Sequence, residues 1–482
     1  GSFGAASSRR DGDGLLTGID ELMLTRHPAH GLVTNAAAGL SSTAFTHNGY
    51  GEVERADSGA LLSVAYLRDG LGRITEKTES RAGATSTVRY RYDDAGRLAQ
   101  EDVDGAVTSF AYDDNGNRLQ AGAQSCEFDD RDRLAACGGT IYDYNDDGQL
   151  AARDDAGAVT SYEYDARGGL RRVVLPDATD VEYLLDATGR RVGKMIDGVL
   201  VRQWLWSDAL KIAAELDGAG EPISRFVYGT RANVPDLVIQ IRFDPEIGEE
   251  RTTYRVIHDH LGSPLFVVDI ATGEVVAERA FDAWGNTLVD TNPGFIPFGF
   301  AGGLEDVDTG LVRFGARDYL PEVGRWATPD PISFAGGDPN RYAYVANDPI
   351  NNIDPSGHAV QVVLFGVVIG LAEVLELAGI SSGLACISNP QACADLAEQA
   401  RQMALAIIAA MSGVGTAATS VAIEAVRERM CPSDPEEQCR AIGNQAYREC
   451  VNGLGPTYGE AEVTFECDAI GRLVEEACRT IL

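Results

Sequence analysis

The sequence predicts a mainly β protein, in which short antiparallel strands build one long coiling sheet, followed by a small helical tail. Two observations point to this fold class. A short aromatic and turn motif recurs between residues 45 and 191, and the cysteine pattern changes near residue 358, with two cysteines before it and seven after. At 482 residues the chain is too long for one ordinary core, so we expect more than one domain.

The repeated motif is an aromatic residue, two residues, Asp or Asn, two residues, Gly, one residue and an apolar residue. Clear copies are "YRYDDAGRL" (Tyr90–Leu98), "FAYDDNGNRL" (Phe110–Leu119) and "YEYDARGGL" (Tyr162–Leu170). Alternating aromatic and apolar residues are typical of a short strand, and Asp or Asn followed by Gly is typical of a tight turn. One such hairpin is unstable alone, so we expect the copies to pair side by side into a long antiparallel sheet.

The repeat aspartates are interpreted as turn formers and not as catalytic groups. Two cysteines, Cys126 and Cys137, flank the turn at Asp129–Asp132 and lie nearly opposite each other on one predicted hairpin. A cross-strand disulfide and a pair of free buried thiols both fit that position.

The formal net charge of the chain is −33, from 73 acidic and 40 basic residues. Such a surface repels phosphate backbones and anionic headgroups, so we expect no nucleic acid partner for the sheet region. Neither a metal nor a cofactor is predicted.

Downstream of the repeats, several ordered motifs carry a family resemblance. "DHLGSPLFVVDIATGEVV" (Asp259–Val276), "FGFAGGLEDVDTGLVRFGARDY" (Phe298–Tyr319) and "DPISFAGGDPNRYAYVANDPINNIDPSG" (Asp330–Gly357) follow one another. Together with the repeats they resemble the YD-repeat proteins of the RHS family, which include teneurins and the shell of ABC-type toxin complexes. The resemblance implies a spiralling antiparallel YD-repeat β-shell over residues 1–250 and an RHS-associated core that plugs it over residues 251–358. It also implies a variable C-terminal segment, commonly a toxin, over residues 359–482.

The stretch "RDYLPEVGRWATPD" contains two aspartates twelve residues apart. From sequence alone they fit two turn residues, or two carboxylates that share a proton and so supply an acid and a base. The family resemblance implies the second arrangement, an aspartyl autoprotease in which Asp318 and Asp330 activate water and Arg317 orients them. The implied cleavage follows the large residue after "DPSG", between His358 and Ala359, where the family usually has leucine instead of histidine.

The tail lacks the repeat and contains two apolar stretches, Ala359–Ile380 and Gln402–Ile423. Buried helices and membrane insertion both fit these stretches. Two matching segments each place two cysteines eleven residues apart, so a helical hairpin would pair Cys439 with Cys478 and Cys450 with Cys467. A zinc site is the rival interpretation, but the tail has neither a close Cys-x-x-Cys pair nor a histidine.

These patterns predict an RHS-type toxin shell that encloses a C-terminal effector and releases it by autoproteolysis, with membrane activity expected of the tail. The alternative is a YD-repeat adhesion or surface scaffold without toxin activity. The expected partners are the tail as enclosed cargo, an immunity protein, secretion machinery, and a membrane for the tail. We expect the protein to be secreted or displayed at the cell surface, by a route that the sequence does not reveal.

Overall fold

The computed structural model describes residues 7–231, 233–244, 248–332, 338–358, 361–364 and 367–370. The prediction of a mainly β, antiparallel fold is confirmed over these residues. The predicted helical, disulfide-rich tail lies outside them. Contacts divide the chain into two compact units, and the fold described here belongs to the first, residues 1–27 and 32–372.

Among the described residues, 28 strands form one antiparallel sheet in which each strand pairs with its neighbours in the chain. We call this sheet the wall. Its strands are β1 Ser8–Arg10, β2 Leu16–Ile19, β3 Leu22–Arg26, β4 Val33–Ala38, β5 Ser41–His47, β6 Val53–Asp57, β7 Leu62–Arg68, β8 Ile74–Arg81, β9 Ala84–Tyr92, β10 Leu98–Val103, β11 Ala106–Tyr112, β12 Arg118–Ala121, β13 Gln124–Phe128, β14 Leu134–Cys137, β15 Thr140–Tyr144, β16 Leu150–Asp155, β17 Ala158–Tyr164, β18 Leu170–Val174, β19 Asp180–Leu185, β20 Arg191–Ile196, β21 Val199–Trp206, β22 Ile212–Asp217, β23 Pro222–Val227, β24 Leu237–Asp244, β25 Gly248–His258, β26 Pro264–Asp269, β27 Val275–Phe281 and β28 Thr287–Asp290.

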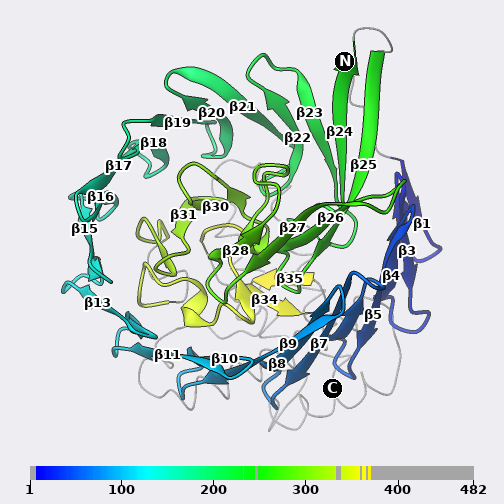
Figure 1. Ribbon diagram of the computed structural model, residues 1–482, viewed down its shortest axis with the longest axis horizontal. Coiled ribbons are helices and arrows are strands. Elements are labelled where there is room, and N and C mark those ends of the chain that lie inside the picture. Colours follow the sequence, from blue (N-terminus) through cyan, green and yellow to red (C-terminus); the bar gives the residue numbers. More distant parts are fainter. Residues whose placement is uncertain are drawn as a thin grey trace, which may run out of the picture. The chain divides into compact units, whose positions relative to one another are not determined.

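The chain then leaves the wall, and we call residues 291–358 the plug. The wall strands curve round the plug strands β30 and β31 (Figure 1). The elements that follow the wall are η1 Phe300–Gly302, β29 Leu304–Glu305, β30 Val312–Phe314, β31 Arg317–Leu320, β32 Arg325–Trp326, η3 Val345–Asn347, β33 Asn352–Ile353, β34 Gln361–Leu364 and β35 Val367–Gly370.

Each repeat closes as one five-residue turn, and the turn at Asp93 is representative. Asp93 Oδ1 accepts the backbone N–H groups of Ala95 and Arg97, and its Oδ2 accepts from Arg97 Nε at 2.7 Å. Gly96 has φ of +84°, which a side chain would strain. The predicted role of the repeat aspartates as turn formers is therefore confirmed at this position.

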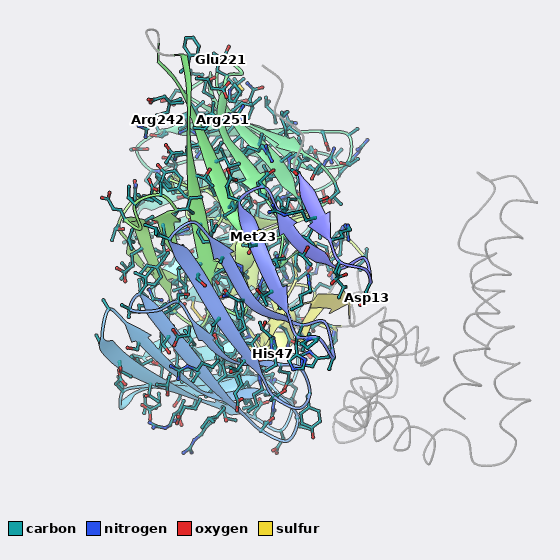
Figure 2. The ribbon with its side chains drawn as sticks, turned by 90° about the vertical axis from the view of Figure 1, so that its right-hand side faces the viewer. Asp13, Met23, His47, Glu221, Arg242 and Arg251 are labelled. Carbon is teal, nitrogen blue, oxygen red and sulfur yellow. A yellow bond between two sulfur atoms is a disulfide. The ribbon has the colours of Figure 1, made fainter. Side chains whose placement is uncertain are left out.

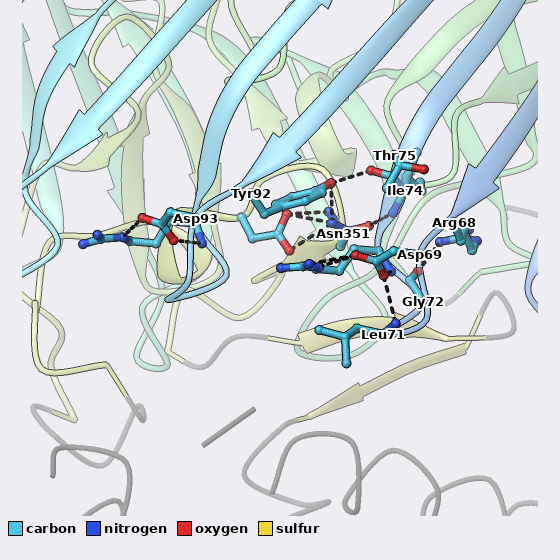
Figure 3. A network of polar contacts seen from close by, with 12 residues as sticks. Arg68, Asp69, Leu71, Gly72, Ile74, Thr75, Tyr92, Asp93 and Asn351 are labelled. Atoms are coloured by element: carbon cyan, nitrogen blue, oxygen red, sulfur yellow. Dashed lines mark hydrogen bonds and ion pairs between the residues drawn. The ribbon is translucent and has the colours of Figure 1, made fainter. Parts of the chain in front are cut away.

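Neighbouring repeats are joined by the tyrosine that directly precedes the motif's aspartate, as in Tyr92 before Asp93. Tyr92 donates its hydroxyl hydrogen to the carbonyl of Ile74 in the preceding repeat, and the Arg73 guanidinium lies 4.5 Å from the Tyr92 ring centroid (Figure 3). Tyr112 contacts the carbonyl of Leu98 in the same way at 2.7 Å. An isolated hairpin lacks this bond to its neighbour, which explains why one hairpin is not stable alone and why the copies stack.

The first and last parts of the wall pack on each other. Leu22 and Ala36 belong to one buried cluster with Leu237 and Val227, and Asp20 forms an ion pair with Arg225. Figure 2 shows β3, which carries Met23, beside the long β24–β25 hairpin, which carries Arg242 and Arg251. Side-chain packing therefore brings β3 and β4 against β23 and β24.

The plug is held by hydrogen bonds to the repeat turns. Asn351 accepts from the Ile74 backbone N–H and donates to Tyr92, as Figure 3 shows, while Ala327 accepts from the Leu150 N–H. Arg325 adds a bond to the Asn117 side chain at 2.9 Å. The turns that close the hairpins thus also form the surface on which the plug rests.

Candidate functional site

Arg317 is the centre of a buried polar cluster at the end of the plug. Its Nη2 lies 3.1 Å from Asp330 Oδ2 and 3.1 Å from Asp354 Oδ2. Its Nε donates to the carbonyl oxygen of Gly357 at 2.6 Å. The guanidinium is 4.1 Å from the ring centroid of Trp326, which covers its flat face. One arginine therefore joins two carboxylates to Gly357, the residue before His358 of the predicted His358–Ala359 cleavage bond.

Burial raises the pKa of Asp330 above its usual value, and Arg317 opposes that rise. Asp354 raises it further, while His358 lowers it. Asp338 is a further acidic neighbour, and burial raises its pKa to about 6. Two carboxylates close together disfavour double ionisation, so this cluster retains a proton more readily than an isolated aspartate does.

Residues 354–358 form a turn that is pressed against the β30–β31 hairpin. Asp354 Oδ1 accepts from the Ser356 hydroxyl at 2.9 Å and from the His358 N–H at 3.2 Å. Gly357 has φ of +67°, and a Cβ there would lie 2.3 Å from the Phe314 carbonyl oxygen. Only glycine fits this approach. The turn consequently holds the backbone of His358 in one place.

Asp318 has different partners from Asp330. Its Oδ1 accepts from Arg191 on β20 at 2.9 Å, and its Oδ2 accepts from Arg313 on β30 at 2.6 Å. Adjacent residues of a strand point to opposite faces, so Asp318 and Arg317 on β31 reach different surroundings. Within the described part of the chain, neither a hydrogen bond nor an ion pair joins Asp318 to Asp330. The predicted Asp318–Asp330 dyad stays a prediction.

The predicted site residues are therefore distributed as follows. Arg317, Asp330 and His358 lie together, Asp318 lies on the other face of β31, and Ala359 is outside the described residues. Sequence reasoning missed Asp354, although it lies in the "DPSG" motif that located the predicted cleavage position. It also missed Arg191 and Arg313, whose role depends on contacts that the local sequence does not encode.

The structure joins Cys126 and Cys137 by a disulfide, between facing residues of β13 and β14. The tail cysteines Cys439, Cys450, Cys467 and Cys478 are outside the described residues, as are the two apolar stretches of the tail for most of their length. Over the residues that are described, no helix has the length and apolar character to span a membrane. These same residues hold no cluster of three or more His, Cys, Asp or Glu arranged for a metal ion.

Comparison with known proteins gives several matches. The chain is 28% identical over 438 residues to Toxin protein Tse5 of Pseudomonas aeruginosa, covering 75% of this chain and 32% of that protein. It is 30% identical to Double-stranded DNA deaminase toxin A of Burkholderia cenocepacia, covering 61% and 22%, and 28% identical to human Teneurin-4, covering 65% and 12%. The chain thus spans about a third or less of the length of these relatives.

A crystal structure of TcdB2-TccC3 aligns with 73% of this chain and 22% of its own, at 16% identity and a TM-score of 0.46. The Teneurin YD-shell family model matches residues 10–350, which is most of the chain. The chain therefore belongs to the Teneurin YD-shell family of RHS/YD-repeat proteins.

Proposed function

We propose that this chain is the C-terminal part of an RHS-type toxin shell that cuts itself between His358 and Ala359 and so frees residues 359–482 as an effector. The observation that carries the proposal is the Arg317 cluster. Arg317 binds the Gly357 carbonyl, one residue before the proposed bond, and binds Asp330 with the same guanidinium. A charged arginine, a carboxyl whose pKa burial raises and a fixed backbone at one point support acid–base hydrolysis of a peptide bond there.

The relatives support the toxin part of the proposal. Tse5 and Double-stranded DNA deaminase toxin A are toxins by name, and they match 75% and 61% of this chain. In the proposal the wall and plug enclose the tail, an immunity protein protects the producing cell, and secretion machinery exports the assembly to the outside or the cell surface. For the tail we keep membrane activity as the expectation, because one of its two apolar stretches, Gln402–Ile423, has 22 residues without a charge.

Within the site, Asp330 and Asp318 both take part in the proposal. Asp330 forms an ion pair with Arg317, which also binds the Gly357 carbonyl, and this shared partner supports a role for Asp330 near the bond. Asp318 adjoins Arg317 on β31 and pairs with two arginines, one of them from the wall. Arg317 orients the acid and holds the backbone ahead of the bond.

The experiment is a comparison of purified wild type with Asp318→Asn and Asp330→Asn by denaturing electrophoresis. Wild type should separate into two pieces that co-purify before denaturation, and each variant should run as one chain of full length. Asp93→Asn, in an ordinary repeat turn, is the matched control and should be cut like wild type. A wild type that stays intact after long incubation contradicts the autoprotease.

A second function is favoured by the family match itself. The family model carries the name of teneurins, and human Teneurin-4 matches 65% of this chain. In this alternative the chain is an adhesion or surface scaffold without a toxic tail. Expression of residues 359–482 in bacteria, together with dye leakage from liposomes exposed to the same segment, separates the two functions. A tail that neither kills cells nor opens liposomes favours the scaffold.

A further inference from the structure

Two repeat turns of the wall carry arginine where other copies bury an apolar side chain. This position is the fifth residue after the Asp or Asn of the motif, and it is almost fully buried in Ile74, Leu98, Leu134, Leu150 and Leu170. In the copies whose turn aspartates are Asp113 and Asp186, the same position is Arg118 and Arg191, and both arginines are buried as well. The wall therefore places two cations where its repeat normally places a hydrocarbon side chain.

The plug neutralises one of these two arginines. Arg191 Nη2 donates to Asp318 Oδ1 at 2.9 Å and forms an ion pair with it. Arg118 is only 5% exposed, yet its Nε and Nη1 have neither a hydrogen-bond partner nor a carboxylate within ion-pair distance among the described residues. Because a buried cation without an acceptor is costly, Arg118 lacks the counterion that its equivalent Arg191 has.

Trp284 adds a second unused donor beside Arg118. The Arg118 guanidinium lies 4.0 Å from the ring centroid of Trp284 and 5.8 Å from that of Phe110. Trp284 is 4% exposed, and its indole N–H has no acceptor in the part of the chain that the structure describes. The plug residue Gly324 lies against both, because a Cβ there would be 2.8 Å from Arg118 Nη1 and 2.5 Å from Trp284 Cε3. The unused donors are thus enclosed where the wall meets the plug.

The charge around Arg118 is also positive. Arg325 on β32 is buried, and its hydrogen bonds go to neutral oxygens, those of the Asn117 and Asn340 side chains and the Asp132 carbonyl. Burial lowers the pKa of Arg325 to about 10, and the charge of Arg118 acts in the same direction. Two neighbouring buried guanidinium groups without a carboxylate ion pair favour a bound anion.

We propose that Arg118 and Trp284 form a binding site for a small inorganic anion of the size of chloride, at the boundary between wall and plug. Arg118 supplies the charge, and the N–H groups of Arg118 and Trp284 supply the hydrogen bonds. A monatomic anion suits these donors, because it accepts hydrogen bonds from any direction. The bound anion neutralises Arg118 as Asp318 neutralises Arg191, and the site is independent of the proposed self-cleavage.

Thermal unfolding of the full chain tests the site. The melting temperature is compared in sodium chloride and in sodium gluconate at equal ionic strength, so that general screening of this acidic protein is the same in both. Gluconate is too large for an enclosed site. Since a ligand that binds only the folded state stabilises it, chloride should raise the melting temperature by about 2 °C or more.

Three variants locate the response. Arg118→Leu restores the apolar residue of the other repeats, so we expect it to fold and to melt equally in both salts. Trp284→Phe keeps an aromatic ring and removes the N–H, and it should weaken the chloride response. Arg97→Leu is the matched control, because Arg97 belongs to a repeat turn and already pairs with Asp93. Arg97→Leu should respond to chloride like wild type.

Iodide provides a second measurement that needs no change at Arg118. The chain has four tryptophans, and an iodide ion bound beside Trp284 should quench part of their fluorescence in a saturable way. Added chloride should reverse that part by competition, and Trp284→Phe should lack it. Collisional quenching of exposed tryptophans rises linearly with iodide instead. This readout in wild type stands even if Arg118→Leu fails to fold.

Three results would overturn the site. A chloride response that persists in Arg118→Leu would place the anion elsewhere. A response that is lost equally in Arg97→Leu would mean that chloride acts on the wall in general. Equal melting in chloride and gluconate, with linear quenching by iodide, would mean that no small anion binds and that water or another part of the chain satisfies Arg118.

Discussion

The turn at Asp93 in the wall and the turn at Asp354 in the plug use the same local design. In both, Oδ1 of the aspartate accepts from the residues two and four positions later, and a glycine with positive φ stands three positions later. They differ in the arginine on Oδ2. Asp93 takes Arg97 from its own turn, whereas Asp354 takes Arg317 from 37 residues away.

Burial separates the two turns further. The Asp93 side chain is 26% exposed and that of Asp354 is 2% exposed. An exposed ion pair contributes little to stability, while a buried carboxylate without its partner is costly. The comparison teaches that one turn sequence serves as a structural unit in the wall and as a candidate reaction site in the plug, and that the difference comes from a distant arginine.

The largest expected effect comes from removing that arginine. In an Asp330→Asn background, which is expected to keep the chain uncut, Arg317→Ala leaves Asp354 buried without its cation and should lower the free energy of unfolding by about 3 kcal/mol or more. Arg97→Ala in the same background should cost about 1 kcal/mol or less. Denaturant unfolding measures both, and equal losses would remove the distinction between the two turns.

The two glycines provide the next test. Gly96→Ala meets only the end of Arg73, 3.9 Å away, so its cost is the positive φ alone, about 1–2 kcal/mol. Gly357→Ala adds a collision with the Phe314 carbonyl and should cost about 1–3 kcal/mol more. Unfolding curves in the uncut background provide the comparison. A Gly357→Ala chain as stable as Gly96→Ala would mean that the plug turn is not tightly packed.

A smaller effect is expected in the pH dependence of stability. Burial raises the pKa of Asp348 in the plug to about 7, against opposing bonds from Asn351 and the charge of Arg73. Since the folded pKa lies above the unfolded value, Asp348 destabilises the fold increasingly as pH rises from about 4 to 7. Asp348→Asn should therefore stabilise the protein more at pH 8 than at pH 5.

The wall aspartate Asp186 should behave in the opposite sense. Its pKa is lowered to about 2, because hydrogen bonds from Thr188 and Arg190 outweigh the effect of partial burial. Its stabilising contribution is present above the unfolded pKa near 4 and is lost as pH falls through 2. Asp186→Asn should thus cost stability at pH 5 and very little at pH 2. Parallel pH profiles for the two variants would contradict the contrast between wall and plug.

The sequence predicts the wall well because the contacts that form each repeat turn join residues that are close together in the chain. The spacing of Asp93, Gly96 and Arg97 specifies the turn. The alternating aromatic residues specify the strand, and the second of them makes the bond to the preceding repeat. The Arg317 cluster is different, because Asp330 and Asp354 reach Arg317 only after the plug has folded. The Asp318–Arg191 pair joins residues 127 positions apart, which no local pattern encodes.

The spacing of Asp318 and Asp330 also carries less information than the position of Asp318 on β31. The family resemblance implies that these two aspartates meet, whereas alternation along β31 sends Asp318 and its neighbour Arg317 to opposite faces. The turn at Asp354 was recognisable as a copy of the repeat turn, and that likeness was the available signal for its geometry.

The most direct test of the account is the intact mass of freshly purified wild-type protein, measured under denaturing conditions with and without a reducing agent. The account predicts two masses, those of residues 1–358 and 359–482, from a single species that was co-purified in native buffer. A single full-length mass after prolonged incubation, or a cut that leaves His358 away from the new chain end, would contradict the claim that the Arg317 cluster hydrolyses the bond after His358.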